Sequence, residues 1–137
     1  MERSSGVEDV IRQMWASISK GDAQAVADLI APVDEVLWIG TDPEEWWSGA
    51  DKAKGVIGEQ LQATGGFDIV GTDPTAFVDG DVAWVADRPA IRLPDGTETP
   101  VRATGVLRRI EGRWQIVQFH ASVGVANEEL LDTELPT

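Results

Sequence analysis

The hydrophobic pattern of this chain changes its period once, near residue 66, and this change limits the folds that it can adopt. Before that point, apolar residues such as Val7, Ile11 and Met14 recur at helical spacing. We predict three helices there, the first ending at Lys20-Gly21, the second running from Asp22 to before Pro32, and the third capped by Ser48 or Asp51 and ending at Gly65-Gly66. A short strand, 35–39, separates the second helix from the third.

Strands and tight turns fill the rest of the chain. The expected strands cover residues 67–72, 75–78, 81–93, 97–110 and 112–122. Turn residues separate the later strands: Asp79-Gly80, Pro94-Asp95-Gly96 and Glu111-Gly112. Helices followed by an antiparallel meander indicate the α+β class.

Length and composition predict one domain, residues 1–125, followed by an acidic tail, residues 126–137. The net charge of −13 argues against a nucleic-acid partner, because phosphate binding needs a basic surface. With one histidine, no cysteine and no nucleotide fingerprint, we expect no metal and no cofactor. No apolar segment is long enough to be a signal peptide or to span a membrane, so we expect a soluble cytoplasmic protein.

The last strand carries the only histidine and has two unlike faces. Strict alternation gives one face with three hydrogen-bonding groups, Gln118, His120 and Ser122, next to Trp114 and Ile116. The other face, 115, 117, 119, 121 and 123, is mostly apolar packing material. We therefore interpret the His120 face as the wall of a pocket.

Turn chemistry predicts which residues lie beside His120. If Pro94-Asp95-Gly96 and Ile110-Glu111-Gly112 are both three-residue loops, Arg88 lies opposite Arg102, and Arg102 faces His120. A two-residue turn in either place would flip the parity and remove Arg102 from this face. Pro89 also indicates a bulge near Arg88. The expected patch is Trp84, Arg88, Arg102, Thr104, Gln118, His120 and Ser122.

The order of elements and the ending Gly112-Arg113-Trp114-Gln115-Ile116-Val117-Gln118-Phe119-His120-Ala121-Ser122 resemble SnoaL-like proteins of the nuclear transport factor 2-like superfamily. The ending is also similar to the association domain of calcium/calmodulin-dependent kinase, which has histidine where Gln118 stands. The resemblance implies a cone-shaped, cystatin-like α+β fold with three helices on a curved, mainly antiparallel sheet. It also implies a pocket between helices and sheet, and a homodimer formed through the outer sheet face. Function varies too widely within the superfamily for the fold to choose one.

Each candidate residue has a structural alternative. His120 is a candidate catalytic base or donor, or else a hydrogen-bonded structural residue. Arg102, with Arg88, could anchor an anionic ligand or form surface ion pairs. Trp15, Trp38 and Trp84 suit a pocket floor or the core. Asp87 and Asp68 are expected to be solvated charges.

These residues favour a small-molecule pocket, either of a proton-transfer enzyme of the isomerase or cyclase type or of a non-catalytic module for ligand binding or homo-oligomerisation. Thr104, Gln118 and Ser122 would contact the ligand, and the opposite face, with Phe119, would form the dimer.

Overall fold

The computed structural model describes all 137 residues. The first half has a short edge strand, three helices and a two-stranded hairpin. Its elements are β1 (Glu2–Arg3), α1 (Ser5–Lys20), α2 (Ala23–Leu29), β2 (Leu37–Ile39), β3 (Trp46–Ser48) and α3 (Ala50–Thr64). Asp22 caps α2 as predicted, since its side chain accepts the backbone N–H of Ala25. Neither Ser48 nor Asp51 caps α3, which begins after Gly49 without a side-chain cap.

The second half forms most of two sheets. Its elements are β4 (Asp68–Val70), β5 (Thr75–Asp79), β6 (Val82–Asp87), β7 (Ala90–Arg92), β8 (Glu98–Pro100), β9 (Arg102–Ile110), β10 (Arg113–Ser122) and α4 (Asn127–Leu131). The large sheet has the order β1-β5-β6-β9-β10-β2-β3, and the small sheet has the order β4-β7-β8. Every pairing is antiparallel except β10 with β2. The α+β prediction is confirmed.

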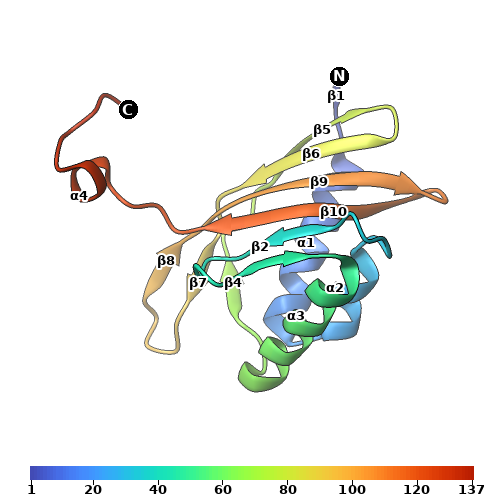
Figure 1. Cartoon of the computed structure of the whole chain (residues 1–137), viewed down its shortest axis with the longest axis horizontal. Coiled ribbons are helices and arrows are strands. Elements are labelled where there is room, and N and C mark those ends of the chain that lie inside the picture. Colours follow the sequence, from blue (N-terminus) through green and yellow to red (C-terminus); the bar gives the residue numbers. More distant parts are fainter.

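The three long helices lie on one face of the large sheet (Figure 1). We call this the inner face and the opposite one the outer face. Leu107, Ile116 and Phe119 point from the sheet toward the helices and are almost fully buried. The C-terminal tail leaves the end of β10 and stands away from the body, with α4 at its middle (Figure 1). No helix has the length and apolar character needed to cross a bilayer.

The first predicted loop is correct. The backbone N–H of Leu93 donates to the carbonyl of Thr97 at 2.8 Å around Pro94-Asp95-Gly96. The register therefore brings Trp84 opposite Val106 and Ala86 opposite Thr104, as expected. However, the predicted strand 81–93 is two strands in different sheets, because Pro89 cannot donate to a ladder and the chain turns there.

The second predicted loop is wrong. Ile110 pairs with Arg113, so the turn has two residues, Glu111 at φ 51° and Gly112 at φ 78°. By itself this turn would place Arg102 opposite Ala121 instead of His120. Together with the bulge described next, it pairs Arg102 with Ser122.

A bulge in β10 then reverses the parity a second time. The register shifts between Ile116 and Gln118, which leaves Val117 as the extra residue. Ile116 and Phe119 consequently share the inner face, although they lie an odd number of residues apart. His120 pairs with Thr104, and Gln118 pairs with Val106. The predicted His120 face combined apolar and polar residues because strict alternation was counted through this bulge.

Candidate functional site

The predicted polar patch lies on the outer face of the sheet, away from the helices. His120, Thr104, Gln118 and Arg102 are all exposed there, while the alternate residues Phe119 and those beside it point inward. The structure does keep most of the patch on one face, because the bulge compensates for the wrong loop. This face does not wall the space between helices and sheet, so that part of the interpretation is corrected.

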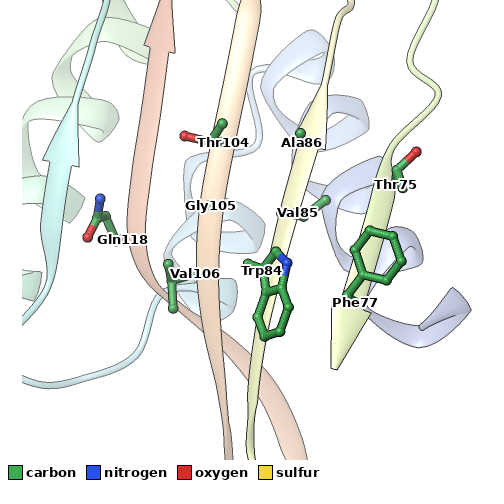
Figure 2. Close-up of a pocket in the computed structure, with 9 residues that line it drawn as sticks. All are labelled: Thr75, Phe77, Trp84, Val85, Ala86, Thr104, Gly105, Val106 and Gln118. Atoms are coloured by element: carbon green, nitrogen blue, oxygen red, sulfur yellow. The ribbon is translucent and has the colours of Figure 1, made fainter. Parts of the chain in front are cut away.

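Part of the patch lines a shallow hollow on the outer face (Figure 2). Trp84, Thr104 and Gln118 surround it together with Phe77 and Val106, and its volume is about 300 Å³. The rings of Phe77 and Trp84 lie on neighbouring strands with their centroids 6.4 Å apart. Three of the predicted ligand-binding residues therefore meet here.

The other members of the patch do not line this hollow. These are Arg88, Arg102, His120 and Ser122. Arg88 borders a separate polar depression with Asp73. The expected catalytic histidine is thus an exposed residue beside the hollow, with no charged partner within ion-pair distance.

A second cavity, of about 320 Å³, lies between the helices and the inner face. Trp15 and Trp38, two of the predicted pocket residues, line it. Its other apolar walls come from α1, α3, both sheets and the loops between them: Ile18, Trp47, Ile57, Leu61, Phe67, Ile69, Pro89, Ile91, Val101, Phe119 and Ala121. This cavity is where the cone fold was expected to have its pocket.

Aromatic rings and a buried carboxylate fix one wall of the inner cavity. Phe119 packs between Trp15 and Trp38, with ring centroids 5.6 Å and 4.8 Å away. The indole Nε1 of Trp15 donates to Oδ2 of Asp87 at 3.0 Å. Asp87 is only 5% exposed, so the expectation of a solvated charge there is wrong. Asp68 is exposed as expected, with Arg92 3.8 Å away.

Glu45 is the only ionisable residue that lines the inner cavity. One carboxylate oxygen, Oε2, accepts the side-chain amide of Gln60 at 2.7 Å, and Oε1 accepts the backbone N–H of Asp42 at 2.8 Å. A Cβ at Gly40 would lie 2.8–2.9 Å from Glu45 side-chain atoms, so only glycine leaves room for this placement. The carboxylate is therefore held in one position at the edge of an apolar space.

Glu45 was not among the predicted site residues, and its place follows from the short hairpin of β2 and β3. Trp46 and Trp47 belong to strand β3, so Trp47 points inward, 7% exposed, and Trp46 outward, 69% exposed. On a strand, residues i and i+2 share a face, which brings Glu45 to the side of Trp47. No group of three or more His, Cys, Asp or Glu side chains lies close enough together to hold a metal ion.

Solved structures with the same architecture define the class of this protein. An NTF2-like protein of unknown function from Pseudomonas putida KT2440 is 17% identical, with a TM-score of 0.75 over 98% of this chain and 96% of that one. A protein assigned provisionally as a dehydratase of the NTF2-like family, from Streptomyces avermitilis, is 22% identical, with a TM-score of 0.75 over 88% and 95%. A provisionally assigned calcium/calmodulin-dependent protein kinase type II association domain from Thiobacillus denitrificans is 20% identical, with a TM-score of 0.74 over 86% and 94%. The fold is therefore the cystatin-like fold of NTF2-like proteins, as the sequence predicted.

Within that class, residues 7–126 match the SnoaL-like domain, which covers most of the chain. The chain belongs to the SnoaL-like family, and the resemblance found in the sequence is confirmed. No curated protein sequence matches it.

Proposed function

We propose that the inner cavity binds a small, mainly apolar molecule that donates a hydrogen bond to Glu45. The observation that carries this proposal is the single carboxylate of Glu45, held by Gln60 and by the backbone of Asp42 at the edge of a mainly apolar cavity. Apolar walls with a few fixed polar groups are typical of small-molecule sites. Trp15 and Trp38 would contact the apolar part of the ligand.

The charge of the cavity favours a neutral or cationic ligand. No lysine, arginine or histidine lines the inner cavity. An anionic group would have to lose its hydration next to Glu45 without gaining a cationic partner, which is unfavourable. Arg102, the expected anion anchor, is exposed on the outer face. We therefore propose a neutral or cationic ligand in place of the anionic ligand expected from Arg102.

Calorimetric titration with three naphthalenes that differ only in their polar group tests this site. We expect 2-naphthylmethylamine to bind more tightly than 2-naphthalenemethanol, and 2-naphthoate to bind most weakly. Glu45→Gln should weaken amine binding by about 10-fold, since a hydrogen bond to a charged group contributes ~1.5 kcal/mol or more. Equal affinity of the amine for both proteins would refute the role of Glu45.

Glu44→Gln is the matched control, because it removes the same charge from the adjacent residue. Glu44 is exposed and does not line the inner cavity. This variant should bind the amine as the unmodified protein does. A loss equal to that of Glu45→Gln would indicate a long-range charge effect instead of a direct contact.

Proton transfer is the reaction that this site supports best. Glu45 is the only ionisable residue that lines the inner cavity, and a carboxylate beside an apolar ligand can act as a general base. The similar fold of the protein provisionally assigned as a dehydratase is consistent with such chemistry. Glu45 therefore replaces His120, which lies on the outer face, as the proposed catalytic base.

Deuterium exchange at the carbon next to the carbonyl of 2-tetralone tests the catalytic proposal. Followed by NMR in D₂O, exchange should be faster with the protein than in buffer and should return to the buffer rate with Glu45→Gln. If 2-tetralone binds but exchanges at the buffer rate, the protein is a binding module for this class of ketone and the enzyme proposal fails.

We also propose that the chain forms a homodimer through the outer face. Two rows of cross-strand neighbours run across this face from β5 to β3. We call them the outer rows: Thr75, Ala86, Thr104, His120, Ile39 and Trp46 in one, and Phe77, Trp84, Val106, Gln118, Leu37 and Ser48 in the other. Neither row contains an acidic residue, although the chain has 24.

This composition is typical of an interface core, where aromatic residues are enriched and charged residues are depleted. Trp46 is 69% exposed and Leu37 42% exposed, which is unusual for large apolar side chains on one continuous sheet face. The interface was expected on the Phe119 face of β10. Phe119 is only 2% exposed, so the outer rows replace it in the proposal.

A further inference from the structure

We propose that the acidic C-terminal tail of each chain docks on the outer face of a second copy, next to a pair of arginines at one end of that face. The proposal rests on the homodimer proposed above, to which it adds a second contact. The tail comprises residues 126–137, joined to the end of β10 by residues 123–125, and the arginine pair is Arg88 and Arg102.

The arginine pair has no acidic partner within its own chain. Both residues are exposed, and neither guanidinium group takes part in an ion pair or a hydrogen bond, whereas those of Arg3, Arg12 and Arg109 are paired. The pairing of β6 with β9 ends at Asp87 opposite Ala103, so Arg88, directly after β6, and Arg102, the first residue of β9, occupy the next positions at this end of the sheet. An acidic chain thus leaves two unpaired cations side by side at one end of the outer rows.

The tail has the complementary charge and exposed apolar side chains. It carries Glu128, Glu129, Asp132 and Glu134 and no basic residue. Leu130 is 70% exposed, Leu131 54% and Leu135 48%. A five-residue helix such as α4 is not stable in water by itself, so its leucines need a surface to cover. The SnoaL-like match ends at residue 126, so the acidic residues and leucines of the tail lie outside the matched region.

The direction of the tail favours a second copy over its own chain. Residues 123–125 lead to the tail from the Ser122 end of β10, beside Arg102, and the tail continues away from the body instead of turning back (Figure 1). Extended chain covers up to about 3.3 Å per residue, so the tail can reach across a partner packed on the outer face. In such a complex the acidic groups of the tail would face the arginine pair, and its leucines would lie near the Phe77–Trp84 hollow of the partner. The tail and the outer face are therefore complementary in charge and in apolar surface.

Charge reversal with complementation tests the contact in the full-length chain. The face variant is Arg88→Glu with Arg102→Glu, and the tail variant is Glu128→Arg with Glu129→Arg. Each alone should weaken the dimer, measured by analytical ultracentrifugation, by about 10-fold or more, because like charges then meet in both contacts. An equimolar mixture should regain the original affinity, because in the mixed dimer both contacts again join opposite charges.

The control variant carries Arg12→Glu and Arg113→Glu, and its dimer affinity should equal that of the unmodified protein. Recovery in a single chain that carries all four reversals, without recovery in the mixture, would show that the tail docks on its own chain and would overturn the proposal. Unchanged dimer affinity in both variants would also overturn it, while the dimer through the outer rows would stand. A monomeric unmodified protein would overturn the dimer and the tail contact together.

Discussion

Asp87 is a buried carboxylate whose hydrogen bonds hold the wall of the inner cavity. Besides the indole of Trp15, it accepts the hydroxyl of Thr72 at 2.6 Å and the backbone N–H groups of Asp73 and Arg88 at 3.0 and 2.8 Å. All four partners are donors, which matches the two acceptor oxygens of the Asp87 side chain. This one side chain therefore ties α1 to the loop before β5 and to the end of β6.

We expect Asp87→Asn to lower the free energy of unfolding by about 3 kcal/mol. The new amide group would face donors that need an acceptor, and an unsatisfied buried donor costs ~1–3 kcal/mol. Urea unfolding measures the change. Asp68→Asn, at an exposed site, is the control and should change stability by less than about 0.5 kcal/mol. Equal effects of the two substitutions would contradict the proposed role of Asp87.

Glu8 makes stability depend on pH. The backbone N–H of Ala76 and the side chain of Arg3 hydrogen-bond its carboxylate and lower its pKa below the ordinary value. The unfolded chain then binds a proton more readily than the folded one, so Glu8 stabilises the fold above the ordinary carboxyl pKa, and this contribution disappears as pH falls through the lowered pKa.

The comparison of the unmodified protein with Glu8→Gln measures this contribution. Their difference in unfolding free energy should be largest near pH 7 and should shrink as pH falls through the lowered pKa of Glu8, below which the carboxyl group is protonated in both states. A difference that stays constant across this range would show that Glu8 acts through packing alone.

At the scale of elements, the outcome for β9 and β10 shows what a sequence can and cannot predict. The loop at Pro94 was predictable, because proline and glycine each fix one backbone conformation. The turn at Glu111 was not, because a non-glycine residue takes a positive φ of 51° there. Nothing in the local sequence marks Val117 as a bulge, which the packing of Ile116 and Phe119 against the helices decides.

The residues of the site also divide into those that the sequence predicts and those that it does not. Trp15 and Trp38 were predictable as pocket residues, because large apolar rings suit the space between helices and sheet. Glu45 was missed because its position depends on a hairpin of two three-residue strands, too short to show a period. His120 was expected on the pocket side because the alternation was counted through the bulge.

Two glycine substitutions test the local structure. Gly112→Ala should destabilise the β9–β10 turn by about 1 kcal/mol, because Gly112 has φ 78°. Gly55→Ala, in α3, should stabilise the protein by about 0.5–1 kcal/mol, since a Cβ there meets no atom within 4 Å. Thermal unfolding measures both. Stabilisation by both substitutions would contradict the two-residue turn.

At the scale of the whole molecule, we propose different functions for the two faces of the large sheet: the inner face binds the ligand and the outer face forms the dimer. The inner face lines a cavity with one carboxylate, and the outer face presents apolar rows without acidic residues. Trp84→Asp should therefore weaken the dimer by about 30-fold or more, as for a central tryptophan at an interface, and leave binding of 2-naphthylmethylamine unchanged.

Leu93→Asp provides the control for Trp84→Asp. Leu93 is similarly exposed but lies beyond the small sheet, and its substitution should leave the dimer intact. Sedimentation at several concentrations gives the dimer affinity. An unaffected dimer in Trp84→Asp would place the interface elsewhere.

We infer that the ligand binds in the inner cavity with Glu45, and not at the polar patch around His120. Calorimetric titration of 2-naphthylmethylamine into Glu45→Gln and into His120→Ala tests it most directly. We predict affinity about 10-fold weaker for Glu45→Gln and unchanged for His120→Ala. Weaker binding in His120→Ala, with unchanged binding in Glu45→Gln, would contradict binding in the inner cavity and would indicate a ligand site on the outer face.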